Sequence, residues 1–113
     1  MYQLYGIKNC DTVKKAIKKL DTSKVSFTFF DFKKGALDEK ILLKWKKSFG
    51  DWPVNQRGRT YRQLKEEFES ASNSEKIKLI LENTSLVKRP VLIKNNSVIC
   101  FGYDEETYNT LES

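Results

Sequence analysis

The N-terminal third of the chain carries the pattern that most restricts its fold: an apolar segment, a turn containing glycine, an amphipathic helix and a second apolar segment. The first strand is predicted at Met1–Tyr5. The second is predicted at Val25–Phe32, where β-branched and aromatic residues dominate. Between them, apolar residues from 13 to 20 recur at the i, i+3, i+4, i+7 spacing of a helix with one buried face. Such a strand-helix-strand unit pairs its strands in parallel with a right-handed crossover.

The turn of this unit carries a cysteine where the helix begins. Cys10 directly precedes Asp11, the first residue of the predicted helix. The first backbone N–H groups of a helix lack intrahelical partners and carry the positive end of the helix dipole, so they favour a thiolate over a thiol. The position indicates nucleophilic or redox sulfur chemistry. The alternative is that Cys10 is a small buried apolar residue, because free cysteine is among the most buried residue types.

A block of three helices is predicted in the middle of the chain. It begins at Leu37 with Asp38 as N-cap and ends near Asn83, and it contains two capping boxes, Thr60–Gln63 and Ser72–Glu75. The side chains expected to face inward are Ile41, Leu42, Trp45, Phe49, Tyr61, Leu64, Phe68, Ile77, Ile80 and Leu81.

The last part of the chain predicts a hairpin and a helix. Strand three is expected at Val87–Ile93 and strand four at Val98–Phe101, joined by a turn at Asn95–Asn96, and a helix capped by Asp104 follows. The hairpin can extend the sheet antiparallel, giving an α/β fold with a mixed four-stranded sheet. We expect one domain over residues 1–113 with a helical insertion at about 37–84. The turn with Cys10 then lies at the carboxyl end of the sheet, where open α/β folds place their sites.

Composition limits the available chemistry. The 113 residues include no histidine and two cysteines, Cys10 and Cys100. Histidine-dependent triads and dyads and four-cysteine zinc or iron–sulfur sites are therefore excluded, and no metal is expected. Cys100 is interpreted as a core residue of a central strand rather than a resolving thiol. The net charge of +6 admits an oxyanion, an acidic protein or nucleic acid as partner, but most lysines lie on predicted helices as solvated faces, so direct nucleic-acid binding is not expected.

The sequence also predicts a location. Apolar and charged fractions of 39% and 32% are typical of a soluble globular protein. No apolar run approaches the roughly 20 residues that span a bilayer, and the sequence does not start with a basic region followed by an apolar one. We therefore expect a cytoplasmic protein without membrane association. We also expect a monomer.

Four segments resemble the arsenate reductase (ArsC) and Spx-related family, a branch of the thioredoxin fold. They are Tyr5–Thr12, Asn55–Gly58, Lys88–Leu92 and Phe101–Glu105, and they occur in this order over nearly the whole chain. Within the family the sequence is most similar to the YffB-type monothiol proteins, thought of as glutathione-dependent thiol reductases. The resemblance implies a thioredoxin-like four-stranded mixed sheet, with a helical insertion between its β-α-β and β-β-α halves.

The resemblance implies roles for single residues. Cys10 corresponds to the nucleophilic cysteine that attacks an oxyanion or a disulfide. Arg57 corresponds to the loop arginine and Arg89 to the arginine before the cis-proline, Pro90. Both arginines help arsenate reductases to hold the anion, and a planar guanidinium suits bidentate contact with an oxyanion or a glutathione carboxylate. Without the resemblance, both would be interpreted as ordinary surface arginines.

Other positions near the predicted site refine this expectation. Asn9 and Thr12 are candidates for hydrogen bonds close to the sulfur. Spx-type redox switches carry Cys-x-x-Cys, whereas this chain has Val13 at the last position, so it cannot form that intramolecular switch. Gly102 stands where arsenate reductases coupled to glutaredoxin have a third arginine near the fourth strand. This departure implies a weaker oxyanion site.

The function implied is that of an arsenate reductase-like thiol oxidoreductase with a single nucleophilic cysteine. Such an enzyme binds no resident cofactor and takes glutathione as co-substrate, or glutaredoxin as partner, to resolve its covalent intermediate. One alternative is an Spx-like regulatory protein that binds the RNA polymerase α subunit without a Cys-x-x-Cys switch. Another is a thioredoxin-fold domain that has lost its activity.

Overall fold

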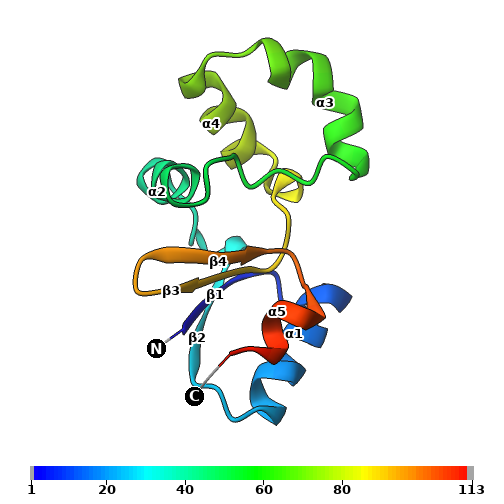
Figure 1. Ribbon diagram of the computed structural model, residues 1–113. Coiled ribbons are helices and arrows are strands. Elements are labelled where there is room, and N and C mark those ends of the chain that lie inside the picture. The colour runs from blue at the N-terminus through cyan, green and yellow to red at the C-terminus, as the bar shows by residue number, and fades with distance from the viewer. Residues whose placement is uncertain (1, 112–113) are drawn as a thin grey trace. The chain divides into compact units, whose positions relative to one another are not determined.

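The order of elements is β-α-β, a block of helices and then β-β-α, as predicted (Figure 1). The computed structural model describes residues 2–111, and no helix in this range is long and apolar enough to cross a membrane. The elements are β1 (Tyr2–Gly6), α1 (Asp11–Thr22), β2 (Phe27–Asp31), the 3-10 turn η1 (Phe32–Lys34), α2 (Glu39–Phe49), α3 (Arg59–Ser70), α4 (Asn73–Glu82), the 3-10 turn η2 (Thr84–Leu86), β3 (Val91–Lys94), β4 (Ser97–Phe101) and α5 (Glu105–Asn109).

The four strands form one mixed sheet in the order β2-β1-β3-β4. β1 runs parallel to β2, with Tyr5 opposite Phe30, and antiparallel to β3, with Tyr5 opposite Val91. The β3-β4 hairpin is antiparallel, which confirms the mixed sheet. The prediction that Cys100 lies on a central strand is wrong, because β3 pairs with β1 and leaves β4 at the edge. The half-buried Cys100 side chain still packs against the core.

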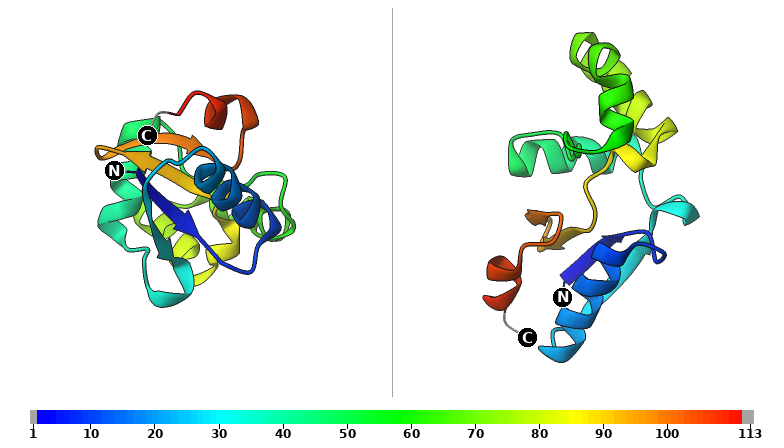
Figure 2. Two further views of the ribbon diagram at one scale, coloured as in Figure 1. Left: turned by 90° about the horizontal axis from the view of Figure 1, so that it is seen from below. Right: turned by 90° about the vertical axis from the view of Figure 1, so that its right-hand side faces the viewer.

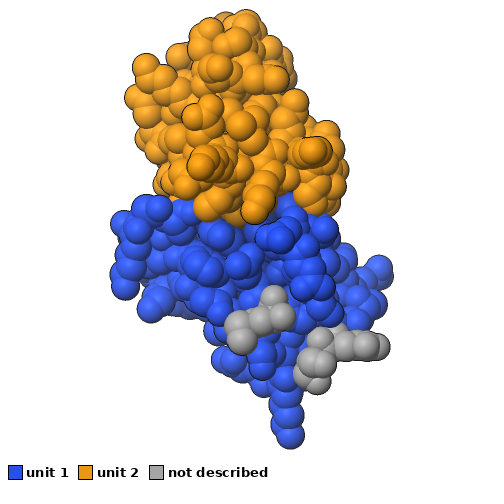
Figure 3. All heavy atoms as spheres, turned by 90° about the vertical axis from the view of Figure 1, so that its left-hand side faces the viewer, with its two compact units in different colours: residues 1–36, 89–113 blue, residues 37–88 orange. Residues whose placement is uncertain are grey.

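The chain divides into two compact units, shown in different colours in Figure 3. Unit 1 comprises residues 1–36 and 89–113 and contains the sheet with α1 and α5. Unit 2 is the continuous segment 37–88 and contains α2, α3 and α4. The helical insertion expected at about 37–84 therefore corresponds to a separately packed segment.

Helices α1 and α5 lie side by side on one face of the sheet (Figures 1 and 2). Ala16 and Leu20 of α1 and Tyr108 of α5 join Leu4 and Leu92 of the sheet in one buried cluster. The predicted helical spacing places these α1 side chains on the buried face, as observed. This cluster anchors the helix that follows Cys10.

The hydroxyl of Tyr108 is buried and has no hydrogen-bond partner among the described residues. Burial raises the pKa of this phenol, and Cys100 and Tyr103 raise it further. An unsatisfied buried polar group costs stability.

We expect Tyr108→Phe to raise the free energy of unfolding by about 1 kcal/mol, measured by urea denaturation. Tyr61→Phe is the control and should not stabilise, because the Tyr61 hydroxyl donates to Glu69 Oε1 at 3.0 Å. A loss of stability in Tyr108→Phe would contradict the prediction.

Unit 2 buries fewer of its apolar side chains than the sequence predicts. Leu42 and Trp45 of α2 are buried as expected. Phe49 and Leu81 were expected to face inward, but they are 49% and 37% exposed. Periodicity identifies the apolar side of a helix, whereas the width of the buried stripe depends on how much of it neighbouring elements cover.

Two predicted helix starts are confirmed by their capping hydrogen bonds. Asp38 caps α2, and its carboxylate accepts from the Ile41 N–H at 2.9 Å. Ser72 caps α4, and its hydroxyl accepts from the Glu75 N–H at 3.3 Å and donates to the Glu75 carboxylate at 3.1 Å. The second contact differs from the usual box, in which the Glu side chain reaches the N-cap backbone N–H.

The capping box predicted at Thr60 is wrong. Helix α3 starts at Arg59 with Gly58 as its N-cap. Thr60 therefore lies within the first turn, and its hydroxyl shares a hydrogen bond with the Ser85 hydroxyl at 2.9 Å. The Thr60 hydroxyl thus pairs with a residue 25 positions away instead of with the backbone of its own helix. A motif of four neighbouring residues cannot predict such a distant partner.

Two predicted strands are shorter in the structure. The strand expected at Val25–Phe32 is confined to β2, because Phe32 opens η1. The strand expected at Val87–Ile93 begins only at Val91, after Pro90, which has no N–H to donate to a ladder. Val87 instead forms an isolated antiparallel bridge with Val54 in unit 2.

Candidate functional site

Cys10 occupies the N-cap position of α1, directly before the first helical residue, Asp11. Helix α1 follows β1 in the chain (Figure 1). Its backbone is extended, with φ −134° and ψ 124°, and its carbonyl accepts from the Lys14 N–H at 2.9 Å. The side chain is half-buried and makes no capping hydrogen bond. The sulfur thus sits at the helix end that favours negative charge, with its thiol not engaged in a cap.

Gly6 fixes the approach of β1 to α1. A Cβ placed on Gly6 would lie 2.9 Å from Cγ2 of Val13, closer than real Cβ atoms approach. Val13 is fully buried, and its branched side chain has little rotamer freedom in a helix. The absent side chain at Gly6 therefore lets the first turn of α1 pack against the end of β1, and this packing holds the Cys10 turn in place.

The strand register brings a second segment to the same end of the sheet. Because β1 and β3 are antiparallel and Tyr5 faces Val91, the chain leaves β1 where it enters β3. The residues directly before β3 are Arg89 and Pro90, joined by a cis peptide bond as the resemblance implies. The Pro90 side chain is fully buried, its carbonyl accepts from the Gly102 N–H at 2.8 Å, and Arg89 is half-buried. The Cys10 turn and the Arg89–Pro90 segment therefore lie at the same end of the sheet in unit 1.

Asn9 and Thr12, the two candidates for hydrogen bonds near the sulfur, flank Cys10 in unit 1. Asn9 is exposed in the turn after β1, and Thr12 is exposed in the first turn of α1. Both are one or two residues from the thiol along the chain. Their contact with the sulfur stays a prediction.

Arg57 belongs to unit 2, in the loop between α2 and α3. The structure therefore gathers the other predicted site residues in unit 1 and gives Arg57 to a separate unit. The loop around it is held by two side chains for which the sequence predicted no role. The Arg57 N–H donates to Asn55 Oδ1 at 3.2 Å, and Arg62 Nη2 donates to the Arg57 carbonyl at 3.2 Å. An asparagine shortly before Gly58 is a recognised turn signal that could have identified Asn55.

A negative charge stands directly beside the thiol. Asp11 is exposed in the first turn of α1, directly after Cys10. In a Cys100→Ser background, we expect Asp11→Asn to raise the rate of Cys10 alkylation by iodoacetamide at neutral pH by about twofold at low salt, because exposed charges interact weakly. Asp21→Asn, at the far end of the same helix, is the matched control and should leave the rate unchanged. A slower Asp11→Asn variant would contradict this electrostatic account.

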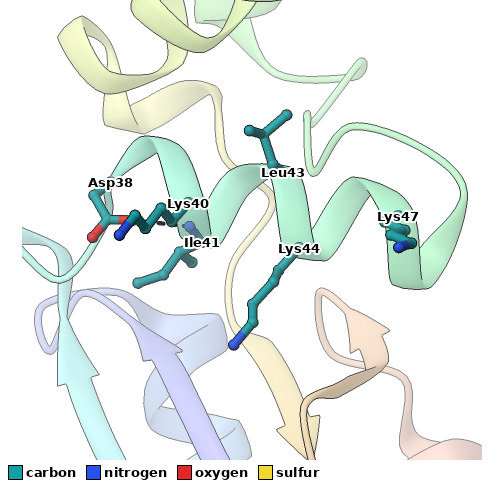
Figure 4. A pocket seen from close by; sticks show the side chains of 6 residues that line it. All are labelled: Asp38, Lys40, Ile41, Leu43, Lys44 and Lys47. Atoms are coloured by element: carbon teal, nitrogen blue, oxygen red, sulfur yellow. Dashed lines mark hydrogen bonds between the residues drawn. The ribbon is translucent and has the colours of Figure 1, made fainter.

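A separate hollow of about 580 Å³ lies on the exposed face of α2 in unit 2 (Figure 4). Three lysines line it, together with Leu43, which is 45% exposed. Leu43 and Lys44 point to opposite sides of the helix, so the lining side chains do not converge on a common centre. The lining residues of the hollow include no cysteine, serine or threonine. Cys10 is therefore the stronger candidate for the reactive group of this protein.

Comparison with known proteins relates the whole chain to one group. The model of the ArsC family matches residues 5–111. A protein of Haemophilus influenzae that carries the name uncharacterized protein is 36% identical over 110 residues, which is 96% of each chain.

Two solved structures extend this comparison. The YFFB (PA3664) protein is 38% identical and covers 96% of each chain, with a TM-score of 0.82. An arsenate reductase (ArsC) related protein from Brucella melitensis is 34% identical, with a TM-score of 0.74, and the match covers 96% of this chain and 91% of that one. The fold is thus the thioredoxin-like fold of these proteins, and the chain belongs to the ArsC family.

Proposed function

We propose that this protein is a thiol oxidoreductase of the arsenate reductase-like kind, in which Cys10 is the single nucleophile and glutathione supplies the electrons. The observation that carries the proposal is the placement of Cys10 at the N-cap of a twelve-residue helix, at the end of the sheet where the chain enters β3 after Arg89 and Pro90. Family membership and relatives named for arsenate reductase support the class of chemistry.

The reaction on a mixed disulfide of glutathione and a small thiol proceeds in two exchanges. The Cys10 thiolate attacks the glutathione sulfur, a Cys10–glutathione disulfide forms, and the small thiol leaves as its thiolate. A second glutathione thiolate then attacks the glutathione sulfur of that intermediate. This step releases glutathione disulfide and restores the Cys10 thiolate, so the two electrons come from glutathione.

The position of the other cysteine supports an external resolving thiol. Cys100 lies on β4, where its thiol donates to the Gly102 carbonyl at 3.2 Å. No disulfide joins Cys10 to Cys100, and Val13 stands where a Cys-x-x-Cys pair would have its second sulfur. Glutathione, or a glutaredoxin, is the proposed resolving partner. Arg89 is proposed to hold the substrate anion or a glutathione carboxylate through a bidentate contact. The role expected for Arg57, which belongs to unit 2, stays a prediction.

The test is to trap the intermediate. The protein is incubated with the mixed disulfide in the absence of free glutathione, alkylated and analysed by peptide mass spectrometry. The expected product is one glutathione on the peptide that contains Cys10, removed when free glutathione is added. Modification of Cys100 alone, or an adduct that free glutathione does not release, would refute the proposal.

A further inference from the structure

A second candidate site lies wholly within unit 2 and is independent of Cys10 and of the proposed function. It is a hollow of about 170 Å³ between the loop that follows α2 and the helices α3 and α4. The loop and these helices can be followed in Figure 1. Its wall includes three aromatic and three charged side chains: Trp52, Tyr61, Phe68, Asp51, Glu69 and Lys76.

The aromatic rings of this wall already hold cations of the chain itself. The Lys46 ammonium lies 4.8 Å from the centre of the Trp52 ring, and the Lys76 ammonium lies 5.5 Å from the centre of the Phe68 ring. Phe68 also meets Tyr61 edge to face, with ring centres 6.1 Å apart. Ring faces attract cations through their quadrupole. The same surfaces are therefore suited to a positively charged ligand.

Two carboxylates add a negative potential at the Tyr61 end of the hollow. Glu69 Oε1 accepts from the Tyr61 hydroxyl at 3.0 Å. Burial raises the pKa of Tyr61, and the hydrogen bond to Glu69 and the charges of Glu69 and Asp51 raise it further. Both carboxylates thus act on the same phenol from the wall of the hollow. A cation placed there would gain from the two charges and from the aromatic rings at once.

We propose that this hollow binds a small organic ammonium ion of the methylated amine type. Its volume is well below the roughly 300–1,000 Å³ of sites for drug-sized ligands, so the occupant must be small. A methylated ammonium is weakly hydrated and presents methyl groups to aromatic rings while its charge faces carboxylates. Lys76 borders the same space with a like charge. The Lys76 ammonium competes with the ligand for the face of the Phe68 ring. A bound ligand would displace this ammonium toward water.

The experiment titrates the whole protein with tetramethylammonium chloride at constant ionic strength, with sodium chloride as the reference salt. Binding is followed by two-dimensional NMR at the Trp52 indole N–H and at the backbone amides of residues 51, 52 and 54–56, since Pro53 has no N–H. We expect saturable shifts with tetramethylammonium and none with sodium.

Charge variants give the prediction its sign. Glu69→Gln keeps an oxygen to accept from Tyr61 but removes the charge, and it should weaken binding at least about fivefold. Lys76→Met should tighten binding about threefold, because it removes the competing cation. Glu82→Gln and Lys78→Met on α4, both outside the hollow, are matched controls and should bind as the unaltered protein does.

The result can overturn the proposal in two ways. Shifts that rise linearly and equal those with sodium would show that the ion does not bind. Saturable binding that is unchanged in Glu69→Gln and weakened in Lys76→Met would show that the Glu69 carboxylate does not hold the ligand and that Lys76 does not compete with it. Either finding would contradict a cation site. An NMR spectrum with native dispersion establishes that each variant is folded before its affinity is read.

Discussion

Replacing Cys10 by serine is expected to lower the rate of glutathione-dependent reduction of a mixed disulfide by at least about 1000-fold, as loss of an enzyme's nucleophile does. A serine hydroxyl stays protonated at neutral pH and does not form the covalent intermediate with sulfur. The substitution removes little else, because the Cys10 side chain makes no capping hydrogen bond and is only half-buried. Far-UV circular dichroism should therefore be unchanged while turnover is lost.

Cys100→Ser is the matched control for this experiment. The Cys100 side chain is also half-buried, and its thiol donates to the Gly102 carbonyl, a contact that a serine hydroxyl can replace. We expect turnover close to that of the unaltered protein, measured by coupling glutathione disulfide production to NADPH oxidation. Equal rates in the Cys10→Ser variant and the unaltered protein would refute the assignment of the nucleophile. Loss of turnover in Cys100→Ser alone would identify Cys100 on β4 as the nucleophile instead.

The second large effect concerns the core beneath α1 and α5. Leu92 of β3 is fully buried in the cluster that joins the sheet to both helices. Leu92→Ala removes three carbon atoms there and leaves a cavity, and the free energy of unfolding should fall by about 2–5 kcal/mol. Leu43→Ala makes the same chemical change at a position that is 45% exposed, and it should alter stability by less than about 0.5 kcal/mol.

Urea denaturation monitored by far-UV circular dichroism measures this difference across both units. Tryptophan fluorescence reports on unit 2, since Trp45 and Trp52 both lie there. The Leu92→Ala transition in the dichroism signal should move to lower urea. An unchanged midpoint would mean that the buried cluster does not limit the stability of unit 1.

Sequence reasoning succeeded where structure depends on local periodicity and local caps. The spacing of Val13, Ala16 and Leu20 predicted α1 and its buried face, and all three side chains are buried. Asp38 and Ser72 were identified as N-caps because the group that each one satisfies lies three residues further along. The same local information placed Cys10 at the start of a helix, which is the part of the candidate site that the residues alone could predict.

Sequence reasoning failed where the outcome depends on partners distant in the chain. A hairpin can add to a sheet through either of its strands, so the pattern around Cys100 could not show that β4 lies at the edge. Thr60 fits a capping box by spacing, but its hydroxyl pairs with Ser85. The meeting of Arg89 and Pro90 with the Cys10 turn likewise depends on the register of β1 with β3 and was reached only through the family resemblance.

The pairing of β1 with β3 also limits when the site can exist during synthesis. Tyr5 and Val91 are partners in this ladder although roughly 85 residues separate them, and closing so long a loop costs entropy before any contact compensates. All of unit 2 lies within that loop. A nascent chain that has not yet reached β3 therefore carries the Cys10 thiol without the Arg89–Pro90 segment beside it. We expect such a chain to hold a helix-start cysteine that is open to oxidation but not yet part of a site.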